Sequence, residues 1–206
     1  MSDLTGGAER SRPAKIALRS QLITARRGLS ATDRQAAASR VQSQILAVVR
    51  REQPAVIAAY VPVGGEPGGA DLPLVLARRA RVLLPVLLPD GDLDWAFFDG
   101  SLDDGPRGLR EPAGPRLGVT AIAAAELVLV PALAVDSSGV RMGRGGGSYD
   151  RALGRLSGSR RPLVLALLHD GELVDAVPAE PHDQRVDGVI TPRGGLSLNH
   201  TAEWTK

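Results

Sequence analysis

The sequence predicts an α/β fold, a three-layer α/β/α sandwich with a mostly parallel sheet and an antiparallel hairpin strand. Three observations predict it. From residue 55 onward, short apolar runs alternate with helical stretches, as in successive βαβ units. The runs consist of Ala, Val, Ile and Leu without polar alternation, which is typical of strands buried on both faces. Pro89-Asp90-Gly91 is a strong turn signal, so the strand after it returns as a hairpin.

The composition limits the classes of protein to consider. The chain has 206 residues, 43% hydrophobic and 23% charged, which is typical of one globular domain. The absence of Cys excludes disulfides and thiolate metal sites. The longest apolar runs, 55–59 and 127–135, are far shorter than the roughly 18–20 residues of a membrane helix. We therefore expect a cytoplasmic monomer that binds no membrane, with a flexible leader (1–10), a single domain (11–191) and a poorly ordered tail (192–206).

A first helix is predicted over about 13–28, with Pro13 near its start. Lys15, Arg19 and Arg26 follow at intervals of four and seven, so they lie on one face of this helix. Lys15 is the only lysine before the last residue of an Arg-rich chain. Arginine forms a planar fork whereas lysine is a point charge, so the choice of Lys at this position indicates a specific role.

The remaining elements follow from capping and periodicity. Ser30, followed by Asp33, caps a second helix that runs to about Arg51 and buries Ala37, Val41, Ile45 and Val48. Further along, we expect strands at 55–61, 81–87, 92–98, 126–135, 163–168 and 187–191, helices at 71–80 and 148–157, and loops at 99–118 and 139–147.

Charge is distributed unevenly along the chain. Residues 1–51 carry ten Lys or Arg against three acids, although the net charge of the whole chain is only +2. An anionic ligand is one explanation of this basic region. A nucleic-acid-binding surface is another, and it would use Lys15, Arg19, Arg26, Arg27 and Arg34. Because the basic residues are not interleaved with aromatic side chains that stack on bases, we expect no nucleic-acid partner.

The segment from Arg141 to Arg151 is the most informative motif. It follows a buried strand, opens a helix and holds Gly143, Gly145, Gly146 and Gly147 in five residues. Such a backbone can turn sharply and bring its N–H groups close to an anion. The motif therefore predicts a phosphate cradle with Arg141 and Arg144 beside it, and a flexible surface loop is the alternative.

The same loop also resembles a dinucleotide-binding fingerprint. Gly143 and Gly145 fit G-x-G-x-x-G, Ser148 stands in the third position, and Asp170 lies where a ribose-binding acid is found. That fingerprint normally follows the first strand of its fold, and here only two short strands remain after it. An NAD(P)-binding oxidoreductase is thus an alternative, less well supported by the order of the elements.

Three acids are candidates for chemistry. Asp150, in the first turn of the helix after the loop, either caps that helix or holds Mg²⁺ against phosphates. Asp183 lies with His182 in a Pro-rich loop that is otherwise ordinary surface. Glu66 lies beyond the first strand, at the edge where α/β sheets bind ligands, and there it either is solvated or accepts hydrogen bonds from the amino groups of a heterocycle.

Four motifs occur in the order found in one known family. They are Lys15-x-x-Leu-Arg19, Tyr60-Val-Pro-Val-Gly-Gly-Glu66, the stretch from Val130 to Arg151 with its glycine-rich loop, and Pro178-x-Glu180-x-His182-Asp183 with the residues up to Thr191. Over about residues 12–191 the chain resembles the 5-formyltetrahydrofolate cyclo-ligase family, also called 5,10-methenyltetrahydrofolate synthetase. This resemblance implies the same α/β/α fold and an Mg²⁺- and ATP-dependent conversion of 5-formyltetrahydrofolate into 5,10-methenyltetrahydrofolate, with ADP and phosphate as products.

The resemblance also implies roles for single residues. Lys15 and Arg19 contact the nucleotide phosphates, and residues 141–149 wrap ATP. Asp150 and Asp183 hold Mg²⁺. Val61 and Glu66 meet the folate, Tyr149 lines the junction of both ligands, and Lys15, Arg141 and Tyr149 take part in catalysis.

The chain departs from the family pattern at one position. Two tyrosines usually precede the Asp of the glycine-rich motif, and here the first is Ser148. Folate binding usually involves aromatic or apolar walls, and aromatic residues are only 3% of this chain. Trp95, Phe97 and Phe98 of the predicted hairpin are the candidates for such a wall.

Overall fold

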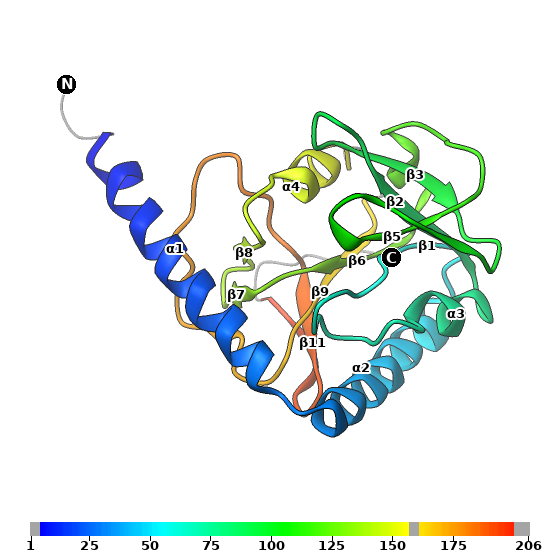
Figure 1. Ribbon diagram of the computed structural model, residues 1–206, viewed down its shortest axis with the longest axis horizontal. Helices are drawn as coiled ribbons and strands as arrows, with labels where there is room; N and C mark the ends of the chain where they lie inside the picture. The colour runs from blue at the N-terminus through cyan, green and yellow to red at the C-terminus, as the bar shows by residue number, and fades with distance from the viewer. Residues whose placement is uncertain (1–4, 157–160, 200–206) are drawn as a thin grey trace.

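The computed structural model describes residues 5–156 and 161–199, with side chains from Pro13 onward (Figure 1). A seven-stranded sheet has the order β12-β11-β9-β6-β1-β2-β3. Its strands are β1 (Val56–Ala58), β2 (Arg81–Leu87), β3 (Leu93–Phe97), β6 (Leu127–Pro131), β9 (Leu163–Leu167), β11 (Gly188–Thr191) and β12 (Gly195–Leu198). The five central strands are parallel, and the edge strands β3 and β12 pair antiparallel to their neighbours. The predicted fold class is confirmed.

Helices cover both faces of this sheet. One face packs against α2 (Ala31–Glu52) and α3 (Leu72–Ala77). The other packs against α4 (Ser148–Leu153) and the 3-10 helix η2 (Ala121–Ala124). In Figure 1, α2 and α3 lie below the sheet and α4 lies above it. These are the three expected layers.

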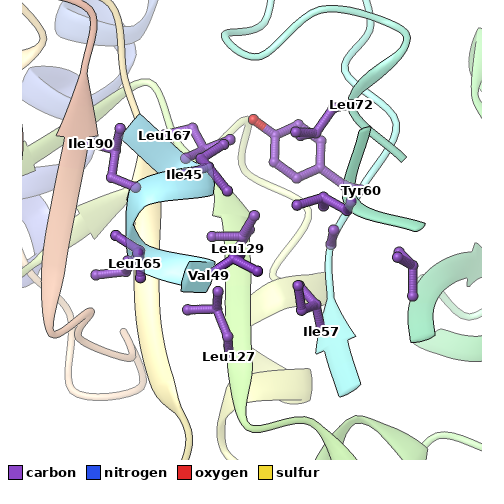
Figure 2. Close-up of a cluster of buried hydrophobic side chains, with 14 of the residues drawn as sticks. Ile45, Val49, Ile57, Tyr60, Leu72, Leu127, Leu129, Leu165, Leu167 and Ile190 are labelled. Carbon is purple, nitrogen blue, oxygen red and sulfur yellow. The ribbon is translucent and has the colours of Figure 1, made fainter. Parts of the chain in front are cut away.

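The apolar runs of the sequence fill both cores. Leu127 and Leu129 of β6 belong to the cluster that faces α2, whereas Val128 and Val130 belong to the cluster on the opposite face. Figure 2 shows Ile45 of α2 beside the leucines of the central strands. Each fully buried Leu, Ile or Val stabilises the fold by roughly 1.5–3 kcal/mol, which explains why the strands show no polar alternation.

The predicted second helix has the expected start. The Ser30 hydroxyl accepts a hydrogen bond from the Asp33 N–H at 3.0 Å, so Ser30 is the N-cap of α2. The helix ends at Gln53, which adopts a left-handed conformation with φ 48° and donates its N–H to Val49. Ala38, rather than the expected Ala37, lies in the buried stripe.

The predicted strand 126–135 is two strands in different sheets. β6 ends at Pro131, which has no N–H with which to continue the ladder. The chain then enters a small sheet of β7 (Ala134–Asp136), β8 (Arg141–Met142) and β10 (Leu173–Val174). Helix α1 (Thr5–Gly28) packs on this small sheet, where Leu22 meets Leu133 and Met142, and Figure 1 shows it beside β7 and β8.

The ends of the chain differ from expectation. α1 begins at Thr5, so Pro13 lies inside the helix and residues 5–10 are helical. Residues 192–194 form a turn, and β12, which begins at Gly195 with φ 65°, pairs with β11. Residues 1–4 and 200–206 lie outside the described residues, and the division into leader, domain and tail stays a prediction.

The expected loop 99–118 is partly regular. It contains a hairpin of β4 (Leu102–Asp104) and β5 (Arg110–Pro112), joined by the 3-10 helix η1 (Pro106–Gly108). Within the ranges 5–156 and 161–199, no helix combines the length and apolar character needed to span a bilayer.

Candidate active site

Two loops meet at the carboxyl edge of the sheet. The loop of residues 61–69 follows β1, and the glycine-rich loop of residues 143–147 follows β8. The Arg144 Nε lies 3.3 Å from Glu66 Oε1, so an ion pair joins the two loops. Ligands of open α/β sheets bind at this edge. The two motifs singled out in the sequence therefore form one site.

The glycine-rich loop has the conformation of a close backbone cradle. Gly145 and Gly147 have φ of 100° and 67°, which side-chain-bearing residues rarely adopt. A Cβ on Gly143 would lie 2.9 Å from the Arg141 Nη1. Arg19 reaches over from α1 and donates from Nε to the Gly143 carbonyl oxygen at 3.1 Å. The expected Arg19 and glycine residues are therefore in contact.

Arg141 is a buried cation whose Nε is an unpaired donor. Its Nη2 pairs with Asp150 Oδ1 at 2.7 Å, and only 4% of its side chain is exposed. The Arg141 Nε has no hydrogen-bond partner among the described residues. Buried donors are rarely left unpaired, and an unpaired guanidinium N–H beside a glycine cradle fits the oxygen of a bound phosphate.

Asp150 does not cap α4. Its Oδ1 accepts hydrogen bonds from Arg141 and from the Gln184 N–H, the latter at 3.1 Å. The N-cap position of α4 is Gly147, which has no side-chain cap. Asp150 lies in the first turn of α4, and its carboxylate is directed at Arg141 and at the loop that carries Asp183. Its role as a metal ligand stays a prediction.

Lys15 binds the acidic loop. Its Nζ lies 2.8 Å from Asp183 Oδ2 and 3.4 Å from Glu180 Oε2. Burial alone would raise the pKa of Asp183, but hydrogen bonds from Lys15 and from the Glu180 N–H outweigh it and lower the pKa. Asp183 therefore stays ionised at neutral pH.

Oxygen ligands gather at this loop. Glu180, His182 and Asp183 each place one ligand atom within 4.8 Å of the others. Carboxylate oxygens suit Mg²⁺, which prefers hard oxygen ligands, and the imidazole of His182 suits it less. Asp150 is not in this cluster, although Gln184, the residue after Asp183, binds it. The two expected metal ligands thus lie on adjoining segments, each paired with a cation.

The site also contains phenols and a carboxylate with shifted pKa values. Burial raises the pKa of Glu66, and the Val63 N–H and Arg144 only partly offset this. Burial and the Glu66 charge raise the pKa of Tyr149, despite the opposing effect of Arg141. Tyr60, which the sequence interpretation missed, has its pKa raised by burial in the same way and donates to the Pro67 carbonyl at 3.2 Å. Both phenols therefore keep their protons at neutral pH.

Other expected residues have different surroundings. The Val61 side chain packs in the core, so only its main-chain groups remain to meet a ligand. Trp95 is fully buried among apolar residues and forms no wall of a binding site. The Arg81 guanidinium carbon lies 3.7 Å from the centre of the Phe97 ring. Phe97 packs against the same hydrophobic cluster as Trp95, and Phe98 packs against the cluster on the opposite face of the sheet.

Residues of the two alternative functions have other partners in the structure. Asp170, the expected ribose-binding acid, lies at the surface, where it accepts the Arg193 N–H and pairs with the exposed Arg193 side chain. Among the cations of the supposed nucleic-acid surface, Arg26 is buried and paired with Glu172, and Lys15 is engaged by two acids. Arg26 and Lys15 are therefore directed at acids of this chain.

Comparisons with known proteins identify the family of this chain. The family model described as the 5-formyltetrahydrofolate cyclo-ligase family matches residues 11–192. The 5-formyltetrahydrofolate cyclo-ligase of Mycolicibacterium smegmatis is 46% identical over 147 residues, which cover 68% of this chain and 75% of that protein. The protein of the same name from Escherichia coli is 30% identical over 141 residues, covering 66% and 77%.

Structural comparison supports the same fold. The solution structure of Aquifex aeolicus 5,10-methenyltetrahydrofolate synthetase matches with a TM-score of 0.77 at 22% identity, covering 93% of this chain and 96% of the other. A synthetase from Mycoplasma pneumoniae matches with a TM-score of 0.67. With its glycine-rich loop, its acidic loop and a family match over nearly the whole chain, this protein belongs to the 5-formyltetrahydrofolate cyclo-ligase family.

Proposed function

We propose that this protein uses ATP and Mg²⁺ to convert 5-formyltetrahydrofolate into 5,10-methenyltetrahydrofolate, with release of ADP and phosphate, in the cytoplasm. Family membership supports the activity. The observation that carries the assignment to this site is the ion pair between Arg144 and Glu66. It places a backbone cradle suited to phosphates next to a buried carboxylate suited to the amino groups of a pterin.

The nucleotide half of the site consists of the glycine-rich loop and α1. The N–H groups of residues 143–147 and the free Arg141 Nε supply donors for phosphate oxygens. Lys15 and Arg19, on one face of α1, add two cations. Ser148, at the start of α4, is bonded to Gly91 and extends this surface.

The folate half consists of Glu66, the main chain of Val61 and Tyr149. Glu66 is held by the Val63 N–H at 3.0 Å, which fixes the direction of its carboxylate. The charges of Glu66 and Arg141 shift the pKa of Tyr149 in opposite directions, and burial keeps its phenol protonated at neutral pH. This supports a place for Tyr149 at the junction of the two halves, where the formyl group and the γ-phosphate must meet.

The reaction needs positioning and charge neutralisation more than covalent catalysis. The formyl oxygen is a poor leaving group, so it first accepts the γ-phosphoryl group of ATP. The second folate nitrogen then attacks the formyl carbon and closes the ring, and phosphate leaves with the oxygen. Lys15, Arg19 and Arg141 hold the phosphates in line and offset the negative charge that develops during transfer.

Asp150 and Asp183, with Glu180 beside Asp183, are the residues that would hold Mg²⁺. Their oxygen atoms match its ligand preference. When bound, the ion neutralises charge on the ATP phosphates. Lys15, which pairs with Asp183, sits next to this position and is free to turn to a phosphate oxygen once another cation neutralises the acids.

The test is an absorbance assay for methenyltetrahydrofolate with 5-formyltetrahydrofolate, ATP and Mg²⁺, each omitted in turn. We expect product only when all three are present. Titration with NAD(P)H provides the contrasting experiment. Micromolar binding of NAD(P)H without binding of ATP would contradict the proposal and favour the oxidoreductase alternative.

A further inference from the structure

A buried ion pair lies beneath the folate half of the site and takes no part in the mechanism above. Arg26, in the last turn of α1, donates from Nε and Nη2 to the two carboxylate oxygens of Glu172 at 2.6 and 2.8 Å. Its Nη2 also donates to the Ala132 carbonyl at 2.5 Å. Both side chains are at most 6% exposed. A two-pronged buried pair of this kind fixes the relative orientation of its partners.

Glu172 in turn holds His169. Its Oε2 accepts the His169 N–H at 2.7 Å, and its own N–H donates to the His169 carbonyl at 3.2 Å. His169 lies just beyond the carboxyl end of β9 and is 7% exposed. Glu172 therefore binds both the N–H and the carbonyl of His169, and these two hydrogen bonds fix the main chain from which the His169 side chain extends.

The His169 side chain contacts the loop that carries Glu66. Its Nε2 lies 2.9 Å from the Gly65 carbonyl oxygen. A carbonyl can only accept, so this bond requires the proton on Nε2. Gly65 has φ of 87°, and a Cβ built on it would lie 3.8 Å from the Arg26 carbonyl oxygen. The loop is thus held between α1 on one side and His169 on the other.

We propose that His169 is a positioning residue for 5-formyltetrahydrofolate, acting through Gly65 on the carboxylate of Glu66. This rests on the proposed function, in which Glu66 meets the folate. Arg26 and Glu172 hold His169 in place, so the series Arg26, Glu172, His169, Gly65 connects α1 to the folate loop. His169 acts on binding of the folate, and among the described residues no hydrogen bond or ion pair joins its side chain to the glycine-rich loop.

The central experiment compares two substitutions at this position. His169→Leu removes the donor to Gly65, and we expect the KM and the Kd for 5-formyltetrahydrofolate to rise about fivefold to tenfold, as for the loss of one buried hydrogen bond. The KM for ATP and kcat of this variant should stay within about twofold of the wild-type values. His169→Gln keeps an N–H donor on a flexible side chain and restores most of the folate affinity. Leu173→Ala, at an exposed position next to Glu172, is the matched control and leaves both KM values unchanged.

A double mutant separates action through Glu66 from a general loss of structure. If His169 acts through Glu66, then adding His169→Leu to Glu66→Gln raises the Kd for 5-formyltetrahydrofolate by less than about twofold beyond Glu66→Gln alone. Arg26→Lys removes the two-pronged bond to Glu172 while keeping the charge. Like His169→Leu, it should raise the KM for 5-formyltetrahydrofolate. This variant serves as the test if His169→Leu does not fold.

The outcomes are distinct. An unchanged folate KM in His169→Leu, equal losses for folate and ATP, or fully additive effects with Glu66→Gln would overturn the role of His169 while leaving the proposed function in place. Absence of turnover and of folate binding in the wild-type protein would instead refute the proposed function, and with it this inference.

Discussion

The two loops of the site are held in different ways. The folate loop is fixed by groups of low exposure, because Glu66 bonds to Val63 within the loop and His169 bonds to Gly65. The glycine-rich loop is held mainly by long arginine side chains, of which Arg144 is 53% and Arg151 is 43% exposed. One loop is therefore held mainly by buried hydrogen bonds, and the other mainly by exposed side chains, which are less constrained.

This difference fits what each half of the site is proposed to bind. A pterin is a rigid ring, so a preformed loop loses little conformational entropy when it binds. A triphosphate is flexible and highly charged, and mobile cations can adapt to it. Changes in the glycine-rich half should therefore affect ATP and turnover, whereas changes in the folate half should affect folate binding and stability.

The largest loss is expected for Asp150→Asn in the glycine-rich half. The substitution removes the negative charge beside Arg141 while an oxygen remains to accept from Arg141 and Gln184. We expect kcat to fall at least about 100-fold, as when one preorganised electrostatic group is removed, with no unfolding. The measurement is turnover across a Mg²⁺ titration, with urea unfolding as the control. Unaltered Mg²⁺ dependence would show that Asp150 holds no metal.

Lys15→Ala should affect ATP binding next most strongly. It removes a cation that lies 2.8 Å from Asp183, and a hydrogen bond from a charged group is worth about 1.5–3 kcal/mol. We therefore expect the KM for ATP to rise at least about tenfold. Lys15→Arg keeps the positive charge but replaces the compact ammonium by a planar guanidinium, so it separates the contribution of charge from that of side-chain shape. An unaltered KM for ATP in Lys15→Ala would rule out contact with the phosphates.

Ser148→Ala tests the anchor of the glycine-rich loop with a smaller expected effect. The Ser148 hydroxyl donates to the Gly91 carbonyl in the turn between β2 and β3 at 2.5 Å, and Arg151 donates to the same oxygen at 2.6 Å. Because one anchor remains, we expect the KM for ATP to rise only about twofold to fivefold. Steady-state kinetics with each substrate varied is the measurement, and a larger change for folate than for ATP would contradict this role.

Glu66→Gln should produce the smallest change, and unlike the other substitutions it should improve a property of the protein, its thermal stability. Burial raises the pKa of Glu66 in the folded protein, so the ionised wild-type carboxylate destabilises the fold at pH above that pKa. The neutral amide should raise Tm at pH 7 by up to about 2–4 °C, and the gain should shrink as the pH falls through the raised pKa. Thermal unfolding at pH 7 and pH 4 measures it, alongside weaker folate binding. A lower Tm at pH 7 would refute this account.

Local patterns in the sequence were enough for most of the fold. Ser30 caps α2 because its signal involves only the next few residues, and the run 81–87 forms β2 because apolar burial dictates it. The break between β6 and β7 was missed, since an uninterrupted apolar run hides a change of sheet. The strand β12 was missed because its four residues have little hydrophobic pattern.

The site was predictable only where its residues are close in sequence or match the family motifs. The pairing of Arg26 with Glu172 joins residues 146 positions apart, and nothing local distinguishes Arg26 from the other arginines of α1. His169 lies after a strand at the ligand-binding edge, which was a usable but unspecific signal. The contact of Val61 with folate stays a prediction, and the inward direction of its side chain depends on packing that the sequence does not show.

The attachment of α1 has a consequence for how the protein is made. The contacts of α1 with Gly143, Glu172 and Asp183 span 124, 146 and 168 residues of sequence. At a translation rate of about 5–20 residues per second, this first-made helix waits roughly 10–30 s before its last partner leaves the ribosome. The strands β1, β2, β3 and β6 can pair during that time, whereas β11 and β12 are made only after Asp183. A nascent chain can therefore form the centre of its sheet well before the cations of α1 reach all of their partners.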